Sequence, residues 1–245
     1  QELAIKEEQA KAAVQLIDEG NTIPFIARYR KEMTGALNDE TLRNLHERLL
    51  YLRNLEEKKE QVINAITDQG KMTEDLKKKI LSAETLVAVD DLYRPYRPKK
   101  QTRATKAKEK GLEPLANILL LQKTTKSMEE EAAAFVNAEK GVANAKEAIA
   151  GAKDIIAEMI ADMADYRKSI RNCTMKQGSL VVKAKDEKAE SVYEMYYDFR
   201  EPLSKVTGYR VLAINRGEKE KFLTVKVEAP DVQIVNALNK TMVKD

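Results

Sequence analysis

Apolar residues recur at helical spacing along most of the chain. Leu42, Leu45 and Leu49 lie three or four residues apart, and they follow Asn38, a residue type that favours the first position of a helix. This pattern predicts a long helix of about thirty residues, up to Gly70. A charged block at residues 56–60 interrupts the apolar seam, which favours a helix packed in a bundle over a sustained coiled coil.

A second long helix is predicted from about Val142 to Asn172, where Ile149, Ala152 and Ile156 supply an apolar face. Between the two long helices the same spacing predicts shorter ones. They are expected at Thr73–Leu81, at Thr85–Leu92, at Leu112–Leu121 and after the capping-type sequence at residues 127–130.

The pattern changes after Gly178. Ser179–Lys185 and Phe222–Glu228 alternate between apolar and polar positions, which predicts two strands. Helices are expected between them, around Ser191–Phe199 and Tyr209–Arg216. We therefore predict a mainly α protein, a multi-helix assembly with two long helices and a small α+β segment at the C-terminal end. The expected domains are a helical body at 1–176 and a mixed segment at 177–245.

Composition limits the possible chemistry. The chain has 245 residues with a net charge of +3, 34% charged residues, one cysteine and one histidine. An internal disulfide is impossible, and no apolar run is long enough to span a bilayer, so we expect a cytoplasmic protein with no membrane partner. The single histidine, His46, excludes sites that need two imidazoles.

Sequence motifs give little support to catalysis. The phosphate-binding patterns GxGxxG and GxxxxGK[ST] and the pair CxxC are absent. Cys173 has no second histidine to activate it. One predicted helix has acidic residues three or four apart, which suits either a metal-dependent nuclease or, far more commonly, a solvated face: Asp154, Glu158, Asp162 and Asp165. We expect no enzyme activity, no catalytic or metal-binding residue and no cofactor.

Positive charge is concentrated in one place. Residues 94–110 contain eight Lys or Arg and one Glu, a local charge of +7, while the rest of the chain sums to −4. Tyr93 and Tyr96 alternate with Arg94 and Arg97. Basic side chains displace counterions from phosphates and tyrosine rings can stack on bases, so this stretch is suited to nucleic acid. The alternative is a basic linker whose charges balance the acidic remainder.

Four segments together resemble the amino-terminal region of the Tex family of bacterial transcription accessory proteins. They are "GNTIPFIARYRKEMTG" (20–35), "DDLYRPYRPKKQTRATKAKEKGLEPLA" (90–116), "YYDFREPL" (196–203) and "RVLAINRGEKE" (210–220). The resemblance implies a cytoplasmic protein whose helical N-terminal part includes a helix-turn-helix-like element. It also implies that an RNase H-like domain, helix-hairpin-helix repeats and an OB-fold RNA-binding domain follow, so we expect this chain to be roughly the first third of such a protein.

The expected function is a non-enzymatic module that supports sequence-independent binding of RNA or DNA in transcription. In the family the strongest contacts are attributed to the C-terminal module, so binding by this part is expected to be weak. The alternative is a helical scaffold that braces other domains or docks to the transcription machinery without touching nucleic acid. The predicted phosphate contacts are Arg94, Arg97, Lys99, Lys100, Arg103 and Lys106, with Arg28, Arg30 and Lys31 as a secondary set.

Overall fold

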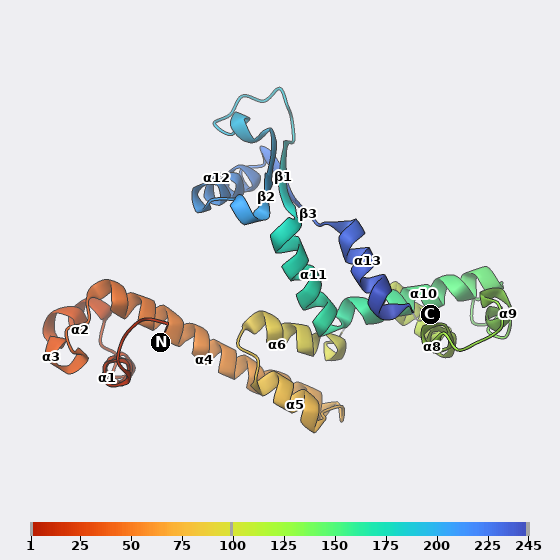
Figure 1. Ribbon diagram of the computed structural model, residues 1–245, viewed down its shortest axis with the longest axis horizontal. Helices are drawn as coiled ribbons and strands as arrows, with labels where there is room; N and C mark the ends of the chain where they lie inside the picture. Colours follow the sequence, from red (N-terminus) through yellow and green to blue (C-terminus); the bar gives the residue numbers. More distant parts are fainter. Residues whose placement is uncertain (1, 99, 244–245) are drawn as a thin grey trace. The chain divides into compact units, whose positions relative to one another are not determined.

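The computed structural model describes residues 2–98 and 100–243, and the chain divides into two compact units, Gln1–Tyr93 and Arg94–Asp245. The first unit is helical. Its elements are α1 (Glu7–Asp18), α2 (Ile23–Tyr29), α3 (Lys31–Thr34), α4 (Asp39–Asp68), α5 (Glu74–Leu81) and α6 (Leu86–Tyr93). In Figure 1, α1, α2 and α3 gather at one end of α4, and α5 and α6 lie at the other.

The end of the first unit formed by α1, α2 and α3 has its own core. It includes Leu16, Ile26 and Leu42, all at most 1% exposed. The Asn38 side chain accepts a hydrogen bond from the Thr41 N–H at 2.8 Å, so the predicted cap does start α4. Gly35 ends α3 at φ 60°, a left-handed conformation that glycine adopts without strain.

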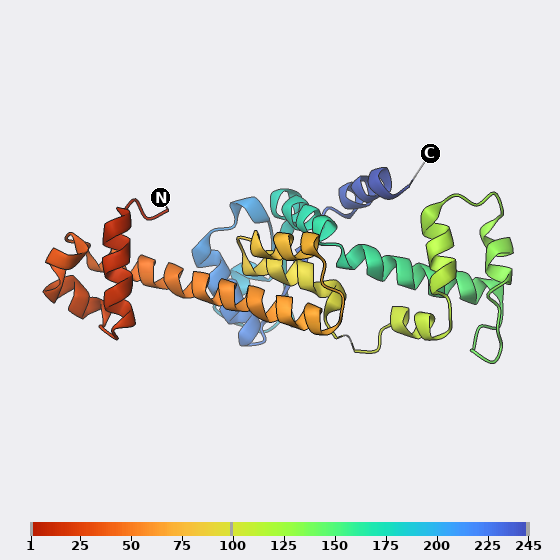
Figure 2. The same ribbon diagram turned by 90° about the horizontal axis from the view of Figure 1, so that it is seen from below.

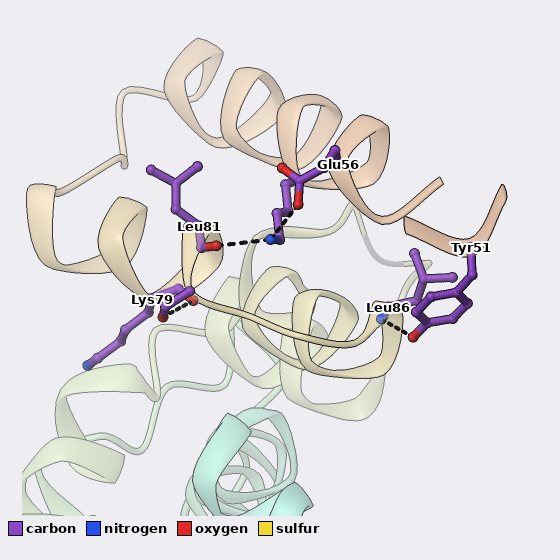
Figure 3. Close-up of polar contacts among 7 residues, drawn as sticks. Tyr51, Glu56, Lys79, Leu81 and Leu86 are labelled. Carbon is purple, nitrogen blue, oxygen red and sulfur yellow. Dashed lines mark hydrogen bonds and ion pairs between the residues drawn. The ribbon is translucent and has the colours of Figure 1, made fainter. Parts of the chain in front are cut away.

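The other end of the first unit is fixed by a buried lysine. The side chain of Lys59 is 8% exposed, and its Nζ donates to Glu56 Oε1 at 2.7 Å and to the Leu81 carbonyl at 2.9 Å. The Leu86 N–H donates to Tyr51 Oη at 3.2 Å. Figure 3 shows these bonds joining α4 to the end of α5 and the start of α6. They satisfy backbone groups that helix ends leave unpaired.

In the second unit α10 is the central helix. The helical elements before the sheet are η1 (Arg94–Tyr96), α7 (Arg103–Glu109), α8 (Glu113–Leu121), α9 (Met128–Ala133), α10 (Ala145–Asp162) and α11 (Ala164–Gln177). α10 contacts α7, α8 and α9, which share one core with it (Figure 2), and it also contacts η1 and α11. Leu112, Leu115 and Ile155 are fully buried in the shared core.

A small sheet follows, with elements β1 (Ser179–Ala184), η2 (Glu194–Tyr196), β2 (Asp198–Pro202), η3 (Leu203–Lys205), α12 (Gly208–Lys219), β3 (Leu223–Glu228) and α13 (Asp231–Met242). The strand order is β2-β1-β3, and both pairings are antiparallel. Val182 is fully buried on one face, where Leu223 and Ile214 of α12 join it in the core.

The predicted fold class is confirmed: the chain is mainly α, with a small α+β segment at the C-terminal end. Two elements differ from the prediction. The second long helix is two helices, because Met163 is extended (ψ 119°) and separates α10 from α11. Ser191–Phe199 is not an α-helix: it contains the short 3-10 helix η2 (Glu194–Tyr196), and its last two residues begin strand β2, which pairs with β1. The predicted domain boundary at residue 176 stays a prediction.

None of the described helices combines the length and apolar character needed to cross a bilayer.

Candidate functional site

The basic segment, defined here as residues 94–110, lies along α10. Its first turn, η1, and its helix, α7, both contact α10 (Figure 2). Thr102 caps α7, since its Oγ1 accepts the Thr105 N–H at 3.1 Å. Ala104 and Ala107 are the buried face of α7, 3% and 4% exposed. The small alanines let α7 pack closely and leave its basic side chains at the surface.

Three contacts connect the basic segment to acidic side chains of α10. Arg94 Nε donates to Asp162 Oδ1 at 2.9 Å, and Thr102 Oγ1 donates to Glu158 Oε2 at 2.8 Å. Arg103 Nη2 lies 3.4 Å from Asp154 Oδ1. The three acids are four residues apart, so they follow one face of α10.

The fourth acid of the predicted series, Asp165, is not on this helix: it lies in the first turn of α11, beyond the break at Met163. The acidic face therefore consists of Asp154, Glu158 and Asp162. Within the described residues, no group of three or more His, Cys, Asp or Glu side chains could hold a metal ion.

A hollow of about 530 Å³ is lined by residues of both the basic segment and α10. One wall is basic and includes Arg94, Arg97 and Lys100, and the other is the acidic face of α10. A group placed in this hollow meets cations from η1, from the loop that follows it and from the start of α7, and carboxylates from α10. Such an arrangement is suited to an anionic group that competes with the carboxylates for the arginines.

The structure brings most of the predicted phosphate contacts together. Arg94, Arg97, Lys100, Arg103 and Lys106 are all at the surface of the basic segment. Lys99 lies outside the described residues. Two further cations of the segment make structural contacts instead, because Lys108 lies 3.4 Å from Glu113 and Lys110 donates to the Gly141 carbonyl at 2.8 Å.

The secondary set lies in the other unit, on α2, its C-terminal cap and α3. Arg28 and Lys31 are exposed there. Arg30 is placed by local contacts: its guanidinium lies 5.0 Å from the centre of the Phe25 ring, and it donates to the Tyr29 carbonyl at 3.1 Å. A cation over an aromatic face is held in place, which makes Arg30 a less adaptable phosphate contact than its neighbours.

Two helix pairs have the lengths of a helix-turn-helix element: α5 and α6, and α7 and α8. A DNA-reading element of this kind places its second helix in the major groove, with polar and basic side chains toward the bases. Neither second helix contains a Lys or Arg, since α6 reads LVAVDDLY and α8 reads EPLANILLL. The cations are instead on the segment before α7 and on α7 itself, where they are suited to phosphates.

Sequence reasoning missed the partners of the basic segment. The acids Asp154, Glu158 and Asp162 were visible at i, i+4 and i+8, but they were interpreted as a solvated face, whereas they face the basic segment.

Comparisons with known proteins identify the family. Two family models match: Tex-like protein N-terminal domain over residues 1–67, and Tex central region-like over residues 123–244. The chain is 44% identical, over its whole length and 34% of the relative, to "Uncharacterized protein YdcI" of Bacillus subtilis (strain 168). It is 41% identical to "Transcriptional accessory protein Tex" of Neisseria gonorrhoeae, over 93% of the chain and 30% of the relative.

A more distant relative is "S1 RNA-binding domain-containing protein 1" of Homo sapiens, 34% identical over 89% of the chain and 22% of the relative. The chain belongs to the Tex family. It spans about a third or less of the length of the curated relatives it matches.

Proposed function

We propose that this chain is a non-enzymatic module of a transcription accessory protein, and that it supports sequence-independent binding of RNA or DNA through phosphate contacts. The single observation behind the proposal is the charge that remains after internal pairing. The basic segment has seven excess positive charges, and the facing side of α10 supplies three carboxylates. Lys108 also faces Glu113, so four carboxylates stand against a sequence charge of +7, and the net charge of the segment and its partners stays at +3, which attracts a polyanion.

The absence of basic residues in α6 and α8 supports sequence independence. Base edges are read by side chains that enter a groove, whereas contacts to the phosphate backbone carry no sequence information. The names of two relatives refer to transcription and to RNA binding, which agrees with the proposed function in transcription.

The test compares two triple variants with the same change in charge. Arg97→Gln, Lys100→Gln and Lys106→Gln together neutralise the basic segment, and Lys71→Gln, Lys77→Gln and Lys78→Gln neutralise exposed lysines of the first unit. Affinity for single-stranded RNA and for duplex DNA is measured by filter binding from about 50 to 200 mM salt, with thermal melting to check folding.

We expect the first triple variant alone to lose affinity for both nucleic acids. The slope of log affinity against log salt should become shallower by about 0.7–0.9 for each phosphate contact removed. Equal affinity for the first variant and the original chain would overturn the proposal. An equal loss in both variants would also overturn it, because only net charge would then matter.

A second candidate function is a scaffold that braces other domains or docks to the transcription machinery without contacting nucleic acid. The ion pairs Arg94–Asp162 and Arg103–Asp154 favour it, because they use cations of the basic segment internally. The scaffold predicts no measurable affinity of the chain for RNA or DNA at about 50 mM salt, where phosphate contacts are strongest.

A further inference from the structure

Asp162 is a buried carboxylate in an unfavourable position. It is the last residue of α10, and its side chain is 10% exposed. The C-terminal end of a helix has a partial negative charge, and burial adds a desolvation cost, so a carboxylate there needs a cationic partner. Arg94 is such a partner, with its Nε 2.9 Å from Asp162 Oδ1.

The bond to Asp162 leaves the two terminal nitrogens of the Arg94 guanidinium able to donate hydrogen bonds to a ligand. The group has five N–H donors in a flat fork, and the bond to Asp162 uses the one on Nε. Among the described residues, Asp162 is the side chain that accepts a hydrogen bond from Arg94, and the Arg94 side chain remains 47% exposed. The two terminal nitrogens, Nη1 and Nη2, form the edge that binds a phosphate with two parallel hydrogen bonds.

We propose that Asp162 is a positioning residue: by binding Nε, it fixes the Arg94 fork so that the terminal nitrogens take one phosphate group in the hollow beside α10. The inference rests on the proposed function, and it assigns a defined binding site to one backbone phosphate of a nucleic-acid strand. Lys100 and Arg97 line the same hollow and add positive charge to it. The site is therefore more specific than a diffuse basic surface.

Neutralising Asp162 should change the affinity for nucleic acid in the direction opposite to the one expected from net charge alone. Removing a negative charge next to a phosphate should strengthen binding if only charge matters. If Asp162 orients Arg94, its neutralisation instead frees the arginine side chain to rotate, and the ordering of that side chain then opposes binding. The sign of the change therefore distinguishes the two accounts.

Asp154 provides a matched control on the same helix. It faces Arg103, whose side chain is 87% exposed and whose Nη2 lies 3.4 Å from Asp154 Oδ1, so the pair is loose. Asp154→Asn and Asp162→Asn change the net charge equally. We expect Asp154→Asn to bind a single-stranded RNA oligonucleotide as tightly as the original chain or more tightly.

For Asp162→Asn we expect a loss of affinity of about three- to tenfold, the cost of ordering one long side chain on binding. The salt slope should also become shallower by about 0.7, one phosphate of a single strand. A general loss of structure would lower the melting temperature without this selective change in slope. If Asp162→Asn binds RNA as tightly as Asp154→Asn, the inference is wrong.

A second variant keeps the test decisive if Asp162→Asn does not fold. Arg94→Lys retains the positive charge but replaces the flat fork with a single ammonium group. We expect about a three- to tenfold loss of RNA affinity at unchanged net charge. An unchanged affinity would refute the proposed phosphate-binding site at Arg94. If the original chain binds neither RNA nor DNA, the proposed function fails and the inference with it. If it binds and both variants bind equally well, only the inference fails.

Discussion

Gly151 lies inside α10 at the point where α7 and the start of α8 come closest. A Cβ atom added there would lie 2.4 Å from Leu112 Cδ1 and 3.2 Å from Ala107 Cβ. Favourable carbon contacts are about 3.5–4.0 Å, so the first overlap exceeds ~1 Å. Leu112 is 1% exposed and Ala107 is 4% exposed, so neither side chain has free space to move into. The Gly151→Ala variant is therefore overpacked.

The size of the effect follows from two opposing contributions. Replacing glycine with alanine in a helix interior stabilises the helix by about 1 kcal/mol. Overpacking a close-packed core costs about 1–3 kcal/mol, and the upper half of that range applies because Ala107 is fixed by its backbone. The expected result is a net destabilisation of about 1–2 kcal/mol, whereas helix propensity alone predicts a stabilisation.

Urea unfolding measures the change, and amide hydrogen exchange in α10 shows whether the loss is local to the α7–α10 contact. Gly208→Ala is the control, because Gly208 starts α12 and has nothing within 4 Å of the added Cβ. We expect Gly208→Ala to leave stability unchanged or slightly raised. A Gly151→Ala variant more stable than the original chain would refute the account of close packing between α7 and α10.

Two further predictions concern single polar contacts. Lys59→Met keeps the side-chain stem but removes the buried bond to the Leu81 carbonyl, and should cost about 1.5–3 kcal/mol in urea unfolding. Lys58→Met, at a more exposed neighbour, should cost under ~1 kcal/mol, and equal costs would contradict the assigned role of Lys59. Hydrogen bonds from the Ser127 backbone N–H and then from its side chain lower the pKa of Glu130. The stability linked to this group is therefore present above its unfolded pKa of about 4.3 and is lost as pH falls through the lower folded value. An NMR titration of the Glu130 carboxyl group with a midpoint at or above the ordinary value would contradict this.

The sequence allowed most helices to be predicted, because helical spacing and caps are local properties. Asn38 and Thr73 start α4 and α5 as expected. The break at Met163 could not be predicted, since the surrounding sequence contains no proline or glycine. Strand β2 was missed for a related reason: Phe199 is opposite Val182 of β1, and pairing across the sheet outweighs the local preference of residues 191–199.

The sequence predicted the charged residues of the candidate site but not the contacts between them. The positive charge of residues 94–110 is a local property, and so is the spacing of the acids on α10. Their pairing is not: Arg94 and Asp162 are 68 residues apart, and only the packing of α7 on α10 brings the two segments together. For the same reason the sequence left binding and internal pairing as alternatives, although the structure contains both exposed cations and ion pairs.

Internal pairing and phosphate contact are compatible on this surface because the ion pairs differ along α10. Asp154 and Asp162 are eight residues apart, about 12 Å along the helix. At the Asp154 end the pair with Arg103 is exposed, and such pairs contribute about 0–1 kcal/mol, so an incoming phosphate can displace the carboxylate at little cost. At the Asp162 end the carboxylate is buried, and removing its arginine would leave an uncompensated charge. A bound strand is therefore expected to displace Asp154 from Arg103 but to contact Arg94 while Arg94 stays bonded to Asp162. Binding would then break the ion pair at the Asp154 end of α10 and keep the one at the Asp162 end.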